Sequence, residues 1–177
     1  MRRIIFALFC FCQLGCQPDI TYAPYNNYLQ GVQSAHQNNK PIFLHFTCWS
    51  CIGYNSFEHH IITNKAVKRL LNQDFISIDL YTDDKTSLDQ KTLQQFIQTI
   101  NFDSLAQQQI LKFKTLGAVN TAIERTLFKK STQPLYVLLS PNGNLLIPPF
   151  GYFGKDPQVL IQNLEKAKKN LHQSSMR

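Results

Sequence analysis

Two cysteines, Cys48 and Cys51, are spaced so that they could do chemistry together. They enclose Trp49 and Ser50 in the segment F-T-C-W-S-C, which follows an apolar run. Two thiols at this spacing can form a dithiol–disulfide pair, bind a metal, or be the remnant of a site that has lost a part. A structural zinc site needs four ligands, and no His-x-x-Cys pattern supplements these two thiols. The spacing therefore favours redox chemistry, and we assign no metal ligand.

The N-terminus has the pattern of an export signal. Met1–Arg3 is positively charged, and Ile4–Cys12 is apolar but too short to span a bilayer. The following Q-L-G-C resembles the end of a bacterial lipobox, with Gln13 in a position that is usually aliphatic. We expect a signal peptide over residues 1–15, acylation of Cys16, and a membrane-anchored lipoprotein on the periplasmic side of the cell envelope.

This processing would leave Cys48 and Cys51 as the free thiols, because Cys10 and Cys12 would be removed and Cys16 acylated. Disulfides can persist in that compartment. The chain has 177 residues, 44% of them hydrophobic, which predicts one packed domain. We expect a tether over 16–26 and the domain over 27–173. The net charge of +7 is spread along the chain without a basic, aromatic-rich stripe, so nucleic-acid binding is not expected.

Hydrophobic patterning predicts an α/β domain. We expect helices over 28–39, 65–71 and 120–128 and from Asp156 onward, strands over 41–47, 74–81, 135–139 and 144–147, and a helical excursion within 87–113. A β-α-β half followed by a β-β-α half is the arrangement of the thioredoxin fold. The fold class predicted is thus a central mixed sheet flanked by helices, with a helical insertion.

Three segments resemble the thioredoxin-like domain of DsbD-type thiol:disulfide interchange proteins. They are K-P-I-F-L-H-F-T-C-W-S-C, then V-K-R-L-L-N-Q-D-F-I-S-I-D-L-Y-T-D-D-K-T, then T-Q-P-L-Y-V-L-L-S-P-N-G. The resemblance covers roughly residues 28–170. It implies disulfide exchange with protein substrates and a redox donor that the sequence does not identify. It also implies a cis-proline that helps to hold the substrate, here Pro134, and we expect Gln133 before it to bind the substrate as well. No Gly-rich phosphate loop points to an organic cofactor.

The resemblance also exposes a shifted spacing. The family's first cysteine, which opens a helix and is the nucleophile, falls on Cys51, and its second falls on Tyr54. Cys48 is an extra thiol upstream. It could resolve the mixed disulfide if its Cα lies within about 7 Å of that of Cys51. The alternatives are a single reactive Cys51, or a domain that has lost exchange chemistry and serves as a binding or assembly module.

Three nearby positions have two possible roles each. His45 stands where related domains bury an acid beneath the thiols, so it could move protons or be a core histidine. Trp49 could contact a partner or belong to the core. Asp83 and Asp84 could form an acidic pair, but we interpret them as solvated turn residues.

Overall fold

The computed structural model describes residues 21–51, 55–100 and 104–174. Its centre is a three-stranded sheet of β1 (Ile42–Thr47), β2 (Ile76–Tyr81) and β3 (Leu135–Leu139), in the order β2-β1-β3. β1 runs parallel to β2 and antiparallel to β3. All residues of β1 and β3 are buried, as expected of apolar strands covered on both faces. The mixed sheet of a thioredoxin fold is confirmed.

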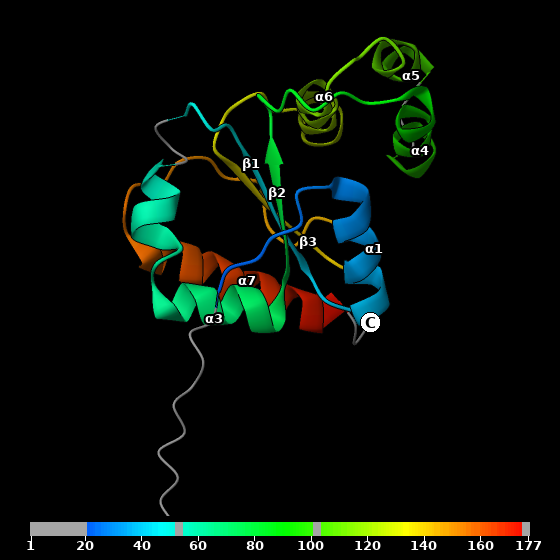
Figure 1. Cartoon of the computed structure of the whole chain (residues 1–177). Coiled ribbons are helices and arrows are strands. Elements are labelled where there is room, and N and C mark those ends of the chain that lie inside the picture. Colours follow the sequence, from blue (N-terminus) through cyan, green and yellow to red (C-terminus); the bar gives the residue numbers. More distant parts are fainter. Residues whose placement is uncertain (1–20, 52–54, 101–103, 175–177) are drawn as a thin grey trace, which may run out of the picture.

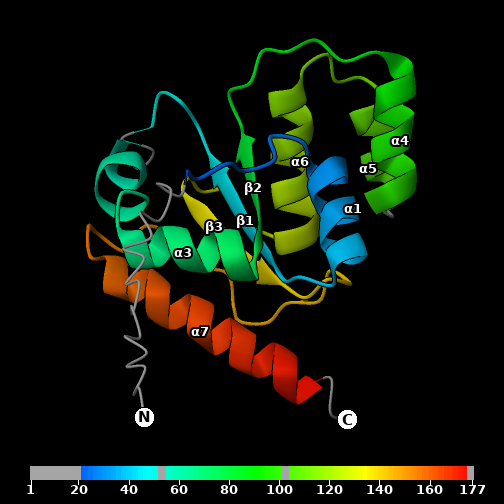
Figure 2. The ribbon, with the colours of Figure 1, turned by 60° about the horizontal axis from the view of Figure 1, so that its bottom comes forward.

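Helices cover both faces of this sheet (Figures 1 and 2). One face is covered by α1 (Tyr28–Asn38) and α6 (Leu116–Phe128), the other by α3 (Lys65–Asp74) and α7 (Pro157–Ser174). Alternate side chains of β1 enter two separate cores, since Leu44 packs with the first pair of helices and Phe43 with the second. The predicted excursion consists of α4 (Gln90–Ile100) and α5 (Ser104–Ile110), which extend the α6 side.

Local signals fix several helix ends. Asn64 caps α3, its side chain accepting hydrogen bonds from the backbone N–H groups of Ala66 and Val67. α6 begins four residues earlier than predicted, because the Thr115 side chain caps it by accepting from the Ala118 N–H. The segment after Cys51 includes a π-helix, η1 (Phe57–Ile61).

The segment predicted as a returning strand over 144–147 does run back antiparallel to β3, but it forms no continuous strand. Only two isolated antiparallel bridges, Leu139 with Leu145 and Tyr136 with Phe150, join β3 to the segment that follows it. The physical reason lies in Pro148 and Pro149, which lack the N–H groups that a continuous ladder requires.

Part of the expected tether packs against the domain. Tyr25 bridges Ile78 at the outer edge of β2, donating its N–H to the Ser77 carbonyl at 2.8 Å and accepting from the Asp79 N–H at 2.8 Å. This contact covers an otherwise open sheet edge. In the described part of the chain, no helix combines the length and apolar character needed to cross a membrane.

Candidate functional site: a cysteine turn at the end of the central strand

Cys48 and Cys51 form a disulfide directly after β1. Their Cα atoms are 5.2 Å apart, within the range that permits the bond. The Cys51 N–H donates to the Cys48 carbonyl at 3.1 Å, so the four residues make a hydrogen-bonded β-turn. Cys48 is buried, whereas Cys51 is partly exposed. An approaching sulfur would therefore meet Cys51 first.

Asp83 holds this turn, which corrects its interpretation as a solvated turn residue. Its carboxylate accepts hydrogen bonds from the Trp49 N–H at 3.1 Å and from the Ser50 N–H at 3.3 Å. It also accepts one from the Ser50 hydroxyl at 3.2 Å. Asp83 thus binds both central residues of the turn that the disulfide closes. Asp84 has a different role, accepting from the Thr86 N–H within its own loop at 2.7 Å.

Trp49 lies at the surface beside the disulfide. Its ring stacks on Tyr81 with centroids 4.4 Å apart and planes 16° apart, yet 49% of the residue stays exposed. It is therefore not a core residue. An exposed, rigidly stacked aromatic ring suits contact with another chain.

His45 lies in the core with a carboxylate beside it. It is fully buried, stacked on Tyr136 at a centroid distance of 4.7 Å and in contact with Phe57 at 4.7 Å. Its Nδ1 is 3.3 Å from Asp79 Oδ1, although neither ring nitrogen has hydrogen-bond geometry with a partner among the described residues. No hydrogen bond or ion pair among those residues joins His45 to Cys48. Its role in proton movement remains a prediction.

Asp79 is the centre of a buried polar cluster. Tyr22, from the N-terminal segment, donates its hydroxyl to Asp79 Oδ1 at 2.9 Å. Burial and the charge of Asp79 raise the pKa of the Tyr22 phenol well above its ordinary value. Burial and the same charge raise the pKa of Glu58, on η1, while His45 acts in the opposite direction. The shifts indicate that these groups share one poorly hydrated environment below the turn.

The loop before β3 contains the other predicted residues. The Gln133–Pro134 peptide bond is cis, as the family resemblance implies, and Pro134 is buried. The Gln133 side chain points inward, donating to Glu124 Oε2 at 2.6 Å. Glu124 also accepts from the Thr132 N–H at 2.7 Å. Burial raises the pKa of Glu124, and these two hydrogen bonds oppose the shift. This buried carboxylate of α6 therefore fixes the two residues that precede Pro134.

Two of the predicted positions lie outside the described residues. They are Cys16, the expected lipidation site, and Tyr54, which occupies the family's second cysteine position. Within the described part of the chain, no three His, Cys, Asp or Glu side chains are grouped to hold a metal ion.

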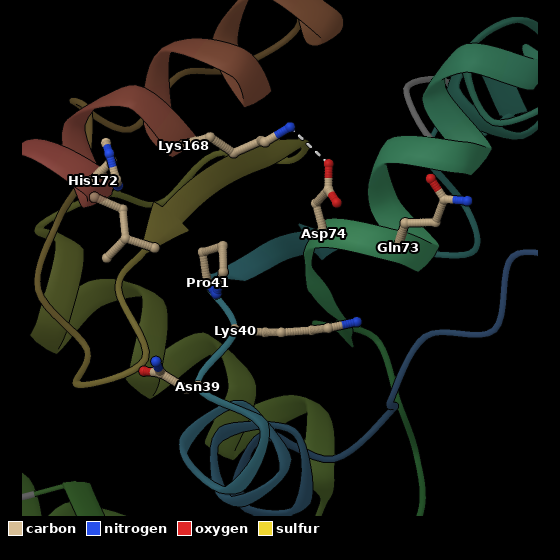
Figure 3. Close-up of a pocket in the computed structure, with 8 residues that line it drawn as sticks. Asn39, Lys40, Pro41, Gln73, Asp74, Lys168 and His172 are labelled. Atoms are coloured by element: carbon tan, nitrogen blue, oxygen red, sulfur yellow. Dashed lines mark hydrogen bonds and ion pairs between the residues drawn. The ribbon is translucent and has the colours of Figure 1, made fainter.

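A pocket at the opposite end of β1 is separate from this site (Figure 3). Its volume is about 590 Å³, and its lining includes Lys40, Pro41, Asp74, Lys168 and His172. Pro41 precedes the six residues of β1 and Cys48 follows them, a separation of roughly 20 Å at about 3.3 Å per residue. The C-terminal ends of α1 and α3 border the pocket, and cations are favourable there. The basic side chains that line the pocket are therefore explained by their favourable interaction with these helix ends.

The sheet, its two helical layers and the cysteine turn define a thioredoxin-fold protein. No protein-family model matches the sequence, and neither does any curated protein. A solved structure described as "DsbH Oxidoreductase" matches with a TM-score of 0.58 and 16% identity, over 86% of this chain and 90% of that one. A thioredoxin from Thermus thermophilus matches with a TM-score of 0.51 and 12% identity, over 85% of this chain and 91% of that one. At these identities the matches establish the fold.

Sequence reasoning missed Asp79, Tyr22, Asp83 and Glu124 as parts of the site. His45 and Asp79 are each the fourth residue of the observed strands, but the predicted strand bounds of 41–47 and 74–81 did not place them in register. Parallel pairing of strands that start in register places these two residues side by side. The partners of the other three residues depend on loop paths that the sequence pattern does not specify.

Proposed function

We propose that this protein carries out thiol–disulfide exchange with protein substrates. The observation that carries the proposal is the disulfide between Cys48 and the partly exposed Cys51, at the end of the central strand of a thioredoxin fold. A disulfide placed at a surface turn can be reached by an external thiolate, whereas a structural disulfide is usually enclosed.

In the reducing direction, the Cys51 thiolate attacks one sulfur of a substrate disulfide. A mixed disulfide forms, and the other substrate sulfur leaves as a thiolate. Cys48, deprotonated in turn, attacks the Cys51 sulfur of that mixed disulfide. The Cys48–Cys51 bond closes, and the second substrate thiolate leaves. Two electrons have then passed to the substrate, and the two thiol protons of the protein have been released to balance the two thiolates. The oxidising direction is the reverse of these steps.

The division of roles follows from exposure. Cys51 is the thiol that a substrate sulfur can approach, and the buried Cys48 is placed to attack from within. Trp49 and the loop that contains Pro134 would contact the substrate chain. Asp79 gives His45 a neighbouring carboxylate with which to exchange a proton at the base of the site.

The cellular location and the redox partners that we propose for this activity rest on the sequence alone. The N-terminal pattern supports export to the cell envelope and a lipid anchor at Cys16. The resemblance to DsbD-type domains supports exchange with protein thiols or disulfides and the need for a separate redox donor. Both are part of the proposal.

Single-cysteine variants of the full chain test the exchange chemistry. The substrate is a fluorescently labelled glutathione disulfide, and peptide mapping identifies the cysteine in any mixed disulfide. We expect Cys51→Ser to abolish exchange, and Cys48→Ser to accumulate a mixed disulfide on Cys51. Cys16→Ser, which changes a cysteine outside the turn, should exchange normally. Exchange that survives Cys51→Ser would contradict the proposal. If no variant, nor the wild type, exchanged disulfides but partner capture persisted, the domain would be a binding module.

A further inference from the structure

The surface of α3 carries a basic stripe. Lys65, Lys68 and Arg69 occupy positions i, i+3 and i+4 of this helix, and therefore share one face. Lys65 and Arg69 are exposed, and Lys68 is partly exposed. None of the three forms an ion pair with another described residue. Within the described domain these three charges therefore have no direct ion-pair partner.

The neighbouring helix α7 adds two more free cations. Lys166 and Lys169 are exposed and lie three residues apart, and they too form no ion pair with a described residue. The acids nearby are already engaged, because Lys168 Nζ lies 2.7 Å from Asp74 Oδ2 and 3.4 Å from Glu165 Oε1. Figures 1 and 2 both show α3 and α7 side by side on one face of the sheet. Five unpaired cations therefore belong to one helical layer.

The first described residue of the chain, Thr21, lies at this same stripe. Asn72 is the i+7 residue of the series that begins at Lys65, so it lies on the same face of α3. Its side-chain amide donates to the Thr21 carbonyl at 2.9 Å, fixing the first described residue against the helix. Tyr22 packs against the core and donates a hydrogen bond to Asp79, which fixes this N-terminal segment to the domain.

The distance from Thr21 to the proposed anchor at Cys16 is short. Five residue steps separate Thr21 from Cys16, and they span at most about 18 Å when fully extended. Surface charges act over about 8–10 Å at physiological ionic strength. An acyl chain on Cys16 would thus hold Thr21, which contacts one end of the α3 stripe, no more than about 18 Å from the lipid headgroups, so that the stripe can come within their reach.

We propose that the face formed by α3 and α7 docks on an anionic phospholipid bilayer. The inference rests on the proposed lipid anchor at Cys16 and is independent of the exchange chemistry. The contact is electrostatic, through Lys65, Lys68, Arg69, Lys166 and Lys169. It fixes the orientation of an anchored domain that would otherwise rotate freely about its short tether.

Lysine footprinting on vesicles tests the orientation. The full chain is expressed in bacteria, purified from the envelope in detergent, and reconstituted into vesicles of phosphatidylcholine alone or with 30% phosphatidylglycerol. Amine labelling is then followed residue by residue. We expect labelling of the α3 and α7 lysines to slow about fivefold on the anionic vesicles, the gain expected for one basic side chain at such a surface. The protection should vanish at about 1 M salt, where charges are screened within about 3 Å.

The chain contains its own control. Lys112 follows the end of α5, Lys129 and Lys130 follow the end of α6, and all three are exposed. α5 and α6 lie on the side of the sheet opposite α3 and α7. The labelling of these three lysines should be the same on both kinds of vesicle. A triple variant with Lys65→Gln, Arg69→Gln and Lys169→Gln should lose the protection of Lys68 and Lys166, whereas Lys112→Gln, Lys129→Gln and Lys130→Gln should leave it intact.

The outcomes separate the two proposals. The mass of the N-terminal peptide shows whether Cys16 carries lipid. If it does, equal labelling of both lysine sets on both vesicles, or equal losses in both triple variants, would overturn the docking face while leaving the anchor in place. If Cys16 carries no lipid, the anchor fails and the docking face fails with it, but the exchange activity of the cysteine pair stands on its own test.

Discussion

Replacing Asp83 with asparagine tests whether this carboxylate holds the cysteine turn in its disulfide-bonded form. Asp83 accepts hydrogen bonds from the N–H groups of Trp49 and Ser50 and from the Ser50 hydroxyl. Asparagine has nearly the same shape, but it carries no charge and has one acceptor oxygen in place of two. The substitution therefore weakens the attachment of the turn without creating a cavity.

The expected effect is a rise in the reduction potential of the pair. Hydrogen bonds to a charged group contribute about 1.5–3 kcal/mol when buried, and partial exposure of Asp83 reduces this to roughly 1 kcal/mol for the net loss. For a two-electron couple, about 1.4 kcal/mol corresponds to about 30 mV, so the shift is about 20 mV. Loss of the negative charge acts in the same direction, since it favours the thiolates of the reduced form.

The single tryptophan of the chain provides the assay, because Trp49 lies inside the turn. Its fluorescence is followed through a graded series of reduced and oxidised dithiothreitol, with alkylation and mass analysis to count thiols. Asp84→Asn is the matched control, since it removes the adjacent charge but no hydrogen bond to the turn. Equal shifts in the two variants, or a lower potential for Asp83→Asn, would refute the reasoning.

Three further predictions concern groups around the site. Glu124→Ala should lower kcat/KM by loosening the loop before Pro134 while leaving the reduction potential unchanged. Because burial raises the pKa of Glu124, the folded state holds this proton more tightly, so the unfolding free energy should fall as pH rises through that pKa, and Glu124→Gln should flatten this slope in denaturant titrations. Gly117→Ala should destabilise the fold by about 1–3 kcal/mol, since a Cβ there would lie 2.6 Å from the Thr82 carbonyl oxygen. An unchanged melting temperature would contradict this and would mean that the loop shifts to accept the Cβ. Tyr22→Phe should cost about 1–3 kcal/mol by leaving Asp79 without its donor, and an unchanged urea midpoint would contradict that.

Much of the fold was predictable because its signals are local. The apolar, β-rich runs of β1 and β3 favoured buried strands, and Thr63 or Asn64 was the expected cap of α3, of which the structure shows Asn64. The cis peptide before Pro134 followed from the family resemblance. Each of these features depends on a few adjacent residues.

The site was less predictable because its contacts join distant segments. Asp83 meets the cysteine turn 33 and 34 positions earlier in the sequence, and nothing in D-D-K distinguishes it from Asp84. Glu124 interrupts the apolar face of α6, and only the path of the loop after that helix explains its burial. The missing ladder at 144–147 was readable from the two prolines that follow it.

The electrostatics near the cysteines are opposite in sign to those of the whole chain. The net charge is +7, yet the turn is held by Asp83, and the core next to His45 contains Asp79. Asp79 lies in β2, and Asp83 follows the end of β2. Because β1 and β2 are parallel, these two acids lie beside β1 and the cysteine turn that follows it. Salt screens surface charges far more than buried ones. Ionic strength should therefore weaken docking on lipid through α3 and α7, whereas the buried pair of Asp79 and His45 is screened little.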